Sequence, residues 1–426
     1  MRRSMHHVKS TSGPASLLLD ANGNPIPHLA NCVTVLSPLE SFFAYNDLKH
    51  ATVLVAEPPW HKDKGEGDAL RWDDSQIMAA QMWVQRKGLP VGFDVVARAV
   101  EVLARERTFH PVRDYLGGLK WDGNQRLDTW LSVYLDAEDN DYTSVVGGRF
   151  LVGAVARVFE PGCKMDYMLV LEGDQGDFKS SVAQILGGEF YIDGLGSEGK
   201  LDRDAILSMA GYWIVEIGEV DEALRHNNAS RVKTFLSRQV DSYRPPYGRS
   251  MVQAKRQCVF IGTTNHDVYL HDPTGNRRFL PVRVWTKPGR VRNANSLTYV
   301  RDQILAEAVA RYRDGERHWF EGVAETAMLA REQNARCIPH AAAADIEQYC
   351  KAGAEWRSPV AISEVFDYIV GPCGRSYLAQ QGNLMKQIPI ELRKLGYTNA
   401  QNRDPNCERE ASGGRGRVRL WWRLPG

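Results

Sequence analysis

Residues 171–181, LEGDQGDFKSS, combine glycines, a lysine and serines in an order that suits phosphate binding. In the P-loop pattern G-x-x-x-x-G-K-[ST], backbone N–H groups surround the phosphates, the lysine reaches the β- and γ-phosphates, and the last hydroxyl holds Mg²⁺. Gly173, Lys179 and Ser180 stand at the required positions, but Phe178 replaces the second glycine. Phenylalanine is compatible with the loop if residue 178 has helical dihedral angles, and it is harmful if the position needs a positive φ.

The setting of this loop is the one that a phosphate-binding loop requires. The short apolar run MDYMLVLEG precedes it, and the helical pattern SSVAQILGG follows. Backbone N–H groups at a helix start, together with the helix dipole, attract phosphate. The alternative is a chance loop. We expect ATP to be bound by Gly173, Gly176, Lys179, Ser180 and Ser181.

Nucleotide hydrolysis also needs acidic groups at the end of a neighbouring strand. The segment YWIVEIGEVDE supplies them, because Glu216 ends an apolar run and Glu219 follows closely. We expect Glu216 and Glu219 to be the catalytic carboxylates, and Ser180 with Glu216 to hold Mg²⁺. The alternative is an acidic helix start, which the helix dipole favours in any protein.

Two further segments end in polar groups that could act on a nucleotide. QCVFIGTTN places Asn265 after an apolar strand, at the sheet edge where open α/β folds bind ligands, although an asparagine there is often only a turn residue. DPTGNRRF places Arg277 and Arg278 beside a turn. One of these arginines could stabilise transition-state charge on the nucleotide of a neighbouring subunit. Alternatively, the pair binds surface carboxylates.

Residues 231–256 carry seven basic residues against one acidic residue, with tyrosines between them. Basic groups suit phosphate tracking and aromatic rings suit base stacking, although a solvated face is the alternative. The expected DNA contacts are Lys233, Arg244, Tyr247, Arg249, Lys255 and Arg256. The C-terminal GGRGRVRLWWRL predicts either a basic wing that touches DNA or a strand buried by its tryptophans.

Length and pattern predict several domains. A chain of 426 residues exceeds one compact core, and its 43% hydrophobic and 25% charged residues are those of an ordinary globular protein. Short apolar strands separated by helices predict a mainly parallel α/β sheet. The predicted divisions are a flexible N-terminal segment at 1–40, a helical domain at 41–140, an α/β P-loop core at 141–290, a helical connector or lid at 291–345, and a winged-helix-like domain at 346–426.

Composition also limits where the protein works. The sequence has no apolar run long enough to cross a membrane, and its N-terminus is a poor signal peptide. Seven cysteines without a C-x-x-C pair fit a reducing cytoplasm. The formal net charge is +1, so any attraction to nucleic acid must come from local patches.

The ordered set LEGDQGDFKSS, YWIVEIGEVDE, VKTFLSRQVDSYRPPYGR, VFIGTTN and DPTGNRRFLPV resembles the virulence-associated protein E family. FHPVRDYLGGLKWDGNQRL is similar to the segment before the ATPase core of that family, so the resemblance spans about residues 105–285. These are P-loop ATPases of phages and mobile elements, similar to superfamily 3 helicases and D5-type ATPases. The resemblance implies an AAA+-like core that forms a ring, expected to be a homo-hexamer, with ATP between subunits.

The same resemblance implies roles for the residues singled out above. Lys179 and Ser180 match the Walker A positions, and Glu216 with Glu219 match the Walker B region. Asn265 matches sensor 1, and Arg277 or Arg278 matches the arginine finger. Residues 231–256 correspond to the segment that contacts DNA. Many relatives sit beside a primase, which makes a primase or another replication protein a candidate partner.

Three functions follow from these patterns. The first is an ATP-hydrolysing DNA motor, a replicative helicase or origin-melting ATPase that acts on single-stranded or origin duplex DNA with Mg²⁺. The second is a nucleotide-binding regulatory or defence protein in which Phe178 has impaired hydrolysis. The third is a DNA-binding protein that needs no ATP. Retention of the whole set of site residues favours the first.

Overall fold

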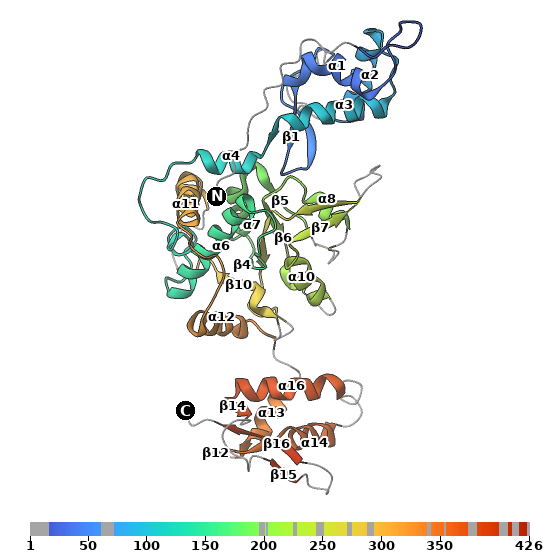
Figure 1. Cartoon of the computed structure of the whole chain (residues 1–426). Helices are drawn as coiled ribbons and strands as arrows, with labels where there is room; N and C mark the ends of the chain where they lie inside the picture. The colour runs from blue at the N-terminus through green and yellow to red at the C-terminus, as the bar shows by residue number, and fades with distance from the viewer. Residues whose placement is uncertain are drawn as a thin grey trace, which may run out of the picture. The chain divides into compact units, whose positions relative to one another are not determined.

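The computed structural model describes residues 17–60, 72–195, 201, 203–224, 228–243, 251–270, 275–287, 294–338, 342–352, 355–373, 381–399, 408–410 and 417–423. The chain forms two units (Figure 1). The first comprises Met1–Asp267 and Arg277–Gln333. The second comprises Val268–Asn276 and Asn334–Gly426.

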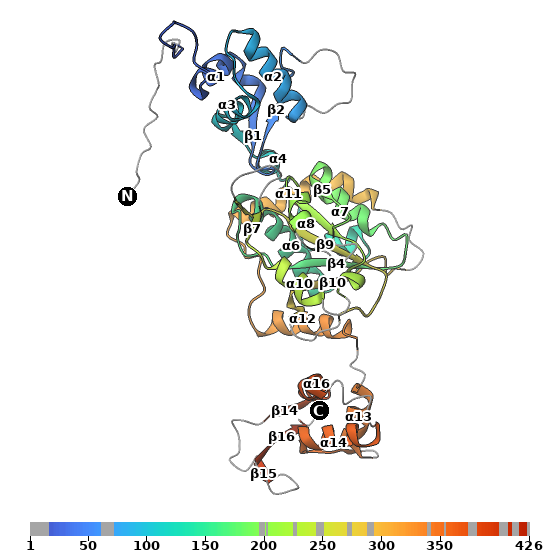
Figure 2. The same cartoon turned by 90° about the vertical axis from the view of Figure 1, so that its right-hand side faces the viewer.

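The first unit begins with a small α/β module that has its own hydrophobic core (Figure 2). Its helices are α1 (Leu29–Leu36), α2 (Asp74–Arg86) and α3 (Phe93–Glu106), with the 3₁₀ helix η1 (Ser37–Phe42) after α1. Its sheet has the order β2 (Ala51–Leu54), β1 (Phe43–Asn46) and β3 (Thr108–Phe109). In α3, the buried residues Val96, Val100 and Leu103 recur at helical spacing, which explains why this helix was predictable.

This module corrects two predictions. Residues 29–40 are not a flexible segment, because Cys32 and Leu36 of α1 are fully buried in the core of the module. The range 41–140 is also not one helical domain, because it contains a three-stranded sheet. The strands were missed because β1 and β2 have only four residues each, too few to show a clear alternating pattern.

The helices that follow belong to a second, larger core. They are α4 (Pro111–Gly118), α5 (Trp130–Tyr134) and α6 (Asp141–Phe159). Val112, Leu116 and Trp130 pack in the same cluster as the strands of the central sheet. The predicted boundary at residue 140 is therefore about thirty residues too late. Asn140 caps α6 through a capping box with Thr143.

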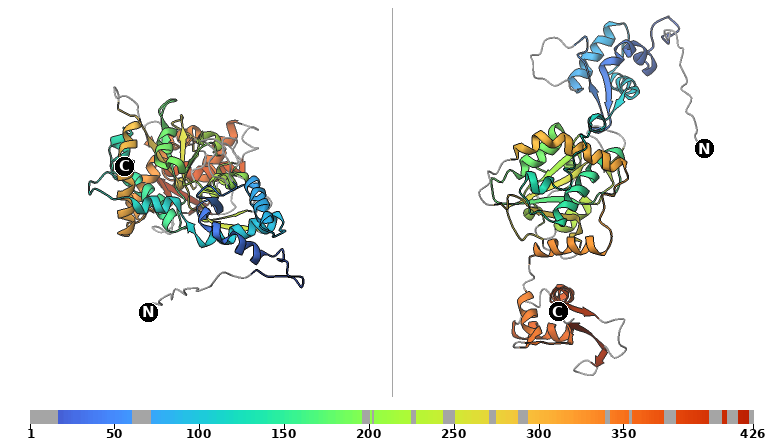
Figure 3. Two further views of the ribbon diagram at one scale, coloured as in Figure 1. Left: turned by 90° about the horizontal axis from the view of Figure 1, so that it is seen from above. Right: turned by 90° about the vertical axis from the view of Figure 1, so that its left-hand side faces the viewer.

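The central sheet is five-stranded and parallel, as expected. Helices lie around it (Figure 3). Its spatial order is β10 (Phe279–Arg283), β4 (Met168–Glu172), β9 (Val259–Thr264), β6 (Ile214–Ile217) and β5 (Tyr191–Ile192). Every residue of β4, β6 and β9 is buried, which explains why their sequences are mostly apolar. Because the strands are parallel, the segments after β4, β6 and β9 meet at one edge of the sheet.

Further elements surround this sheet. The helices are α7 (Lys179–Gly187), η2 (Gly188–Phe190), α8 (Arg203–Ser208), α9 (Val220–Ala223), α10 (Asn228–Leu236), η3 (Asn276–Arg278), α11 (Asn295–Arg313) and α12 (Val323–Ala335). An antiparallel pair joins β7 (Val240–Tyr243) to β8 (Val252–Lys255). Helix α11 was predicted as a connector, but Ile304 and Leu305 are fully buried in the core of the sheet. Within the described residues, no helix combines the length and apolar character needed to cross a membrane.

The second unit pairs helices with small antiparallel sheets. Its elements are α13 (Ala343–Cys350), β11 (Lys351–Ala352), β12 (Glu355–Trp356), β13 (Val360–Ala361), α14 (Ile362–Cys373), α16 (Gln381–Lys394), β14 (Tyr397–Asn399), β15 (Glu408–Glu410) and β16 (Arg417–Arg423). Strand β16 pairs with β13, β14 and β15. The Trp421 side chain is 2% exposed, so this tryptophan follows the buried-strand alternative. The winged-helix assignment stays a prediction.

Candidate functional site

The predicted phosphate loop lies between the end of β4 and the start of α7. Both of its glycines suit the shape of the loop. A Cβ atom on Gly173 would lie 2.6 Å from the Asp177 Oδ2 atom, and Gly176 has a φ of +87°. The Asp177 carboxylate is buried and accepts a hydrogen bond from the Asp174 N–H across 2.7 Å. A buried carboxylate that no sequence motif singled out therefore stabilises the loop from inside.

Phe178 adopts the left-handed conformation, with φ 51° and ψ 24°. The position thus needs a positive φ, which is the unfavourable case for phenylalanine and costs about 1–2 kcal/mol relative to a right-handed backbone. The side chain is 48% exposed, so the backbone carries the strain without a packing clash. Two contacts hold the backbone here: Val182 N–H donates to the Phe178 carbonyl, and the Trp285 indole donates to the Asp177 carbonyl.

The loop presents backbone donors. Within the described part of the chain, the N–H groups of Gln175, Gly176 and Phe178 donate to no protein acceptor. They precede the first turn of α7, where the helix dipole adds partial positive charge. This arrangement is typical of an anion-binding site.

Lys179 is 8% exposed, and its ammonium group is held at the sheet edge. The Nζ atom donates to the carbonyl oxygens of Gly173 at 2.9 Å and Asp174 at 2.7 Å, and to Asn265 Oδ1 at 2.9 Å. The structure therefore brings Asn265 to the phosphate loop, as its place after β9 suggested. A bound phosphate would have to replace at least one of these three oxygen acceptors of Lys179 Nζ.

Ser180 and Glu216 meet directly. Ser180 Oγ donates to Glu216 Oε1 across 2.7 Å, and Glu216 is 3% exposed at the end of β6. Thr263 Oγ1 donates to the same oxygen at 3.0 Å, and the Tyr191 hydroxyl donates to Oε2. Burial raises the pKa of Tyr191, and the Glu216 carboxylate raises it further, so the phenol stays protonated as a donor. Thr263 and Tyr191 were not among the predicted site residues, although Thr263 stood in the GTTN segment.

The residues present fit Mg²⁺. A hydroxyl and a carboxylate oxygen are hard donors, and Mg²⁺ in nucleotide sites is held by one or two carboxylates together with substrate phosphates. Among the described residues, no group of three or more His, Cys, Asp or Glu side chains could hold a metal by itself. Ser180 and Glu216 would therefore share the ion with the phosphates.

Glu219 and Asp221 follow Glu216 at the same edge but differ in exposure. Glu219 is exposed, has a φ of +49° and precedes α9. Asp221 is 9% exposed, accepts a hydrogen bond from Thr264 Oγ1 at 2.9 Å, and lies 3.5 Å from the His266 ring. Glu219 is therefore free of packing constraints and faces solvent, whereas Asp221 ties α9 to the end of β9.

Arg277 and Arg278 lie at the other edge of the sheet. They precede β10, whose first residue pairs with Met168 at the start of β4, whereas the phosphate loop follows Glu172 at its end. Four strand steps of about 3.3 Å separate the two edges. Arg277 is exposed, and Arg278 Nε donates to Ser237 Oγ at 2.6 Å. Within one chain, the two arginines therefore lie at the amino-terminal ends of the strands, and the loop lies at the carboxyl-terminal ends.

The predicted DNA contacts divide into three groups. Arg244, Tyr247 and Arg249 lie outside the described residues. Lys255 is exposed on β8, as a phosphate contact requires. Lys233 is 7% exposed on α10, which removes the premise that it belongs to a solvent-facing basic surface.

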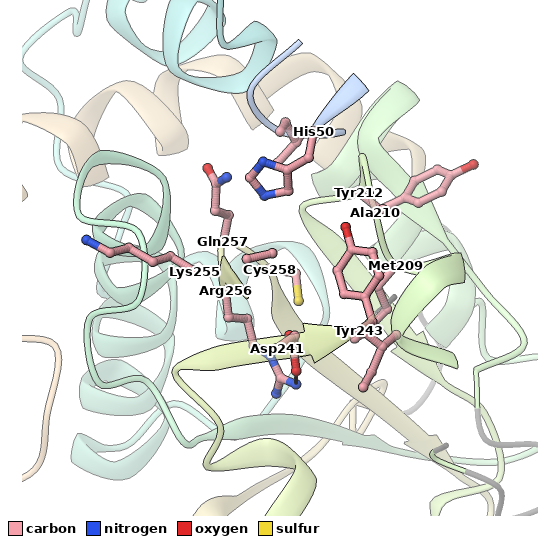
Figure 4. A pocket seen from close by; sticks show the side chains of 13 residues that line it. His50, Met209, Ala210, Tyr212, Asp241, Tyr243, Lys255, Arg256, Gln257 and Cys258 are labelled. Carbon is pink, nitrogen blue, oxygen red and sulfur yellow. Dashed lines mark hydrogen bonds and ion pairs between the residues drawn. The ribbon is translucent and has the colours of Figure 1, made fainter. Parts of the chain in front are cut away.

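Arg256 corrects a prediction. It is 3% exposed, and its guanidinium forms two hydrogen bonds with the Asp241 carboxylate, at 2.5 and 2.8 Å (Figure 4). A third hydrogen bond reaches the Phe235 carbonyl. Arg256 thus forms a buried ion pair that joins α10 to the β7–β8 hairpin, and its burial removes it from a surface that could contact DNA. The adjoining cavity of about 40 Å³ holds little more than a water molecule.

Among solved structures, an apo A form of the NrS-1 C-terminal region is 11% identical and has a TM-score of 0.46, covering 94% of this chain and 100% of that chain. A second apo structure of the NrS-1 C-terminal region (305-718) is 12% identical with a TM-score of 0.41, covering 91% and 97%. Likeness at this level says nothing about activity. No curated protein matches the sequence.

The family comparison is more specific. The family model described as "Virulence-associated protein E-like domain" matches residues 116–337. This range contains the phosphate loop, the central sheet, Arg277 and Arg278. This range is more than half of the 426 residues. The chain therefore belongs to the virulence-associated protein E-like family.

Proposed function

We propose that this protein is an ATP-hydrolysing DNA motor, a ring-shaped replicative helicase or origin-melting ATPase of a phage or mobile genetic element. One observation carries the proposal most directly: Ser180 donates to Glu216 across 2.7 Å, beside the buried Lys179 ammonium group. A lysine, a hydroxyl and a carboxylate at the carboxyl edge of a parallel sheet are the groups that phosphoryl transfer needs.

Each group has a task in ATP hydrolysis. The open N–H groups of the loop and Lys179 would bind the β- and γ-phosphates. Ser180 and Glu216 would hold Mg²⁺, which neutralises phosphate charge when bound. Glu219 is exposed just beyond β6 and is suited to orient the attacking water. Asn265 already contacts Lys179 and would turn toward the γ-phosphate.

A ring of subunits, expected to contain six, would complete the site. Arg277 and Arg278 lie at the opposite sheet edge from the loop, so neither serves the nucleotide of its own chain. Head-to-tail contact between copies brings the two edges together, and such contacts close into rings. An arginine from the neighbour would then stabilise charge in the transition state.

DNA contact is proposed for the β7–β8 hairpin. Lys255 is exposed there, and the segment between its strands contains Arg244, Tyr247 and Arg249. Basic and aromatic residues on one hairpin suit a single strand. A primase or another replication protein in the bacterial or phage-infected cytoplasm is the candidate partner.

The test is ATP turnover with and without single-stranded DNA at fixed salt, because DNA binding depends on salt. Lys179→Ala should reduce turnover by at least about 100-fold, since it removes a charge that stabilises the transition state. Lys87→Ala, which changes an exposed lysine of the N-terminal module, is the matched control and should be neutral. Wild-type turnover that neither DNA nor Lys179→Ala changes would contradict the proposal.

The second candidate is a nucleotide-binding regulatory or defence protein with impaired hydrolysis. The left-handed backbone at Phe178 and the three protein oxygens around Lys179 favour it. It predicts ATP binding without turnover, and turnover gained in Phe178→Gly. A DNA-binding protein that needs no ATP would instead bind DNA equally well in Lys179→Ala.

A further inference from the structure

A cavity of about 480 Å³ opens at the amino-terminal edge of the central sheet, away from the phosphate loop. Its lining comes from four places: the segment before β4, η3 before β10, the connection between α11 and α12, and α12 itself. Its size lies within the range of small-molecule pockets, about 300–1,000 Å³. No group of the proposed hydrolytic site lines it, apart from Arg277 at its rim.

The Asp166 carboxylate lines this cavity, and the buried Arg157 is an electrostatic neighbour of it. Asp166 is 6% exposed, yet among the described residues it makes neither a hydrogen bond nor an ion pair. Its oxygen atoms are not fully buried, so the carboxylate opens to the cavity, where a ligand that donates hydrogen bonds would pair with it. The cavity therefore selects for a ligand with N–H donors.

The walls are aromatic and the rim is cationic. Tyr167 and Phe320 meet edge to face with ring centroids 5.0 Å apart, and Trp319 is 48% exposed beside them. Lys164 and Arg277 are exposed at the cavity. Flat rings stack on planar ligands, while the two cations attract an anionic group attached to such a ligand.

We propose that this cavity binds a nucleotide whose base carries an amino group. The base stacks on Trp319, its amino group donates to Asp166, and its phosphate pairs with Lys164. Cytosine and adenine offer one amino group, and guanine adds a ring N–H beside it, whereas thymine and uracil present a carbonyl oxygen at that place. A carboxylate repels that oxygen, so the cavity discriminates against thymine and uracil.

This inference does not depend on ATP hydrolysis, because the cavity and the phosphate loop lie at opposite sheet edges. The experiment therefore uses the full-length Lys179→Ala variant without ATP or Mg²⁺. Two single-stranded oligonucleotides are compared, one containing 5-iododeoxycytidine and the other 5-iododeoxyuridine. They differ in the amino group and react on irradiation with nearby aromatic rings. Cross-linked peptides are then mapped by mass spectrometry at fixed salt.

The expected result is cross-linking at Tyr167, Trp319 or Phe320, stronger for the cytidine probe. Trp319→Ala should lower it by at least about fivefold, the low end for the loss of one base stack. Asp166→Asn should abolish the preference for cytidine, because an amide donates as well as accepts. Tyr299→Ala changes an aromatic residue that is 87% exposed and is the control that should leave binding unchanged.

Competition identifies the source of the nucleotide. An unlabelled oligo(dC) that competes far better than dCMP shows that the strand is the ligand, and equal competition shows that a free nucleotide is. Cross-links confined to residues 231–256, with Trp319→Ala and Asp166→Asn equal to the parent protein, overturn the proposal. So does a cavity filled by a second copy of the chain, seen as protein oligomers that Trp319→Ala dissociates without any cross-link there.

Discussion

The Trp285 indole Nε1 donates a hydrogen bond to the Asp177 carbonyl across 2.5 Å, joining the end of β10 to the phosphate loop over 108 residues of sequence. Trp285 is itself fixed, because its backbone N–H donates to the Leu135 carbonyl at 2.7 Å. Asp177 immediately precedes Phe178. The left-handed conformation of Phe178 is therefore supported by a contact from a residue that follows another strand.

Trp285→Phe should weaken the loop. It leaves a buried carbonyl without its donor, which costs about 1–3 kcal/mol in the free energy of unfolding. The affinity for ATP should fall as the loop loses its fixed shape. Urea unfolding and ATP binding measure both effects. The matched control is Trp130→Phe, because the buried Trp130 Nε1 has no partner among the described residues. If Trp285→Phe and Trp130→Phe lost equal amounts of unfolding free energy, the loss would come from the smaller side-chain volume and not from the hydrogen bond.

Phe178→Gly should relieve backbone strain. Glycine adopts a positive φ at no steric cost, so the folded state should gain up to about 1–2 kcal/mol, less the entropy that glycine loses on folding. Turnover should be kept or increased. Phe178→Ala is the comparison, since it removes the same ring but retains Cβ and hence the strain. Identical unfolding curves for the two variants would assign the effect to the ring.

Glu216→Gln should raise the Mg²⁺ concentration needed for half-maximal turnover and reduce maximal turnover by at least about 100-fold. The reason is that the variant lacks the negative charge of the carboxylate that holds the metal against the phosphates. Thr263→Val removes one hydrogen bond to the same carboxylate at 3.0 Å and should have a smaller effect in the same direction. Metal titrations of turnover separate the two. A Thr263→Val protein with an unchanged metal requirement would show that the threonine only fills space.

His110 should make stability depend on pH. Burial is the main cause that lowers the pKa of His110, against a hydrogen bond with Gln257 that raises it. Because the folded pKa lies below the unfolded value of about 6.5, the neutral ring stabilises the fold above that pH. This contribution is lost as the pH falls through the folded pKa.

The measurement is urea unfolding at pH 7.5 and at acidic pH values below about 6. His110→Asn keeps an acceptor at the start of α4 and should lose less stability on acidification than wild type. His28→Asn is the control, because His28 also accepts a hydrogen bond at a helix start but is exposed. If the free energy of unfolding fell as steeply with pH in His110→Asn as in wild type, His110 would be excluded as the source of the pH dependence.

Arg277→Ala and Arg278→Ala should each be tested alone and mixed with Lys179→Ala. If neighbours share a site, the inactive arginine variant and Lys179→Ala should regain turnover when mixed, because mixed rings contain some intact interfaces. Mixing Lys179→Ala with Ser180→Ala is the control, since both changes lie at the same sheet edge, and it should restore nothing. Absence of recovery with both arginine variants would argue against a shared site.

The sequence was sufficient where the chemistry is local. Glu216 lies near the end of an apolar strand, and Lys179, Ser180 and Asn265 come after such strands. The parallel sheet brings their positions to one edge. It was insufficient where a residue depends on a distant partner. Arg256 looked like a surface cation until Asp241 and burial were known. The backbone of Phe178 depends on Trp285, which no local pattern connects to it.

The left-handed backbone at Phe178 also bears on how such loops are detected in genomes. A glycine in a motif marks where a positive φ is permitted, and a search that demands the letter will pass over chains that reach the same φ by other means. In this chain, residue 178 reaches a positive φ without a glycine, and a tryptophan more than a hundred residues later holds the neighbouring carbonyl. A search that requires the glycine would pass over this chain, although its backbone at residue 178 has the φ that the glycine permits.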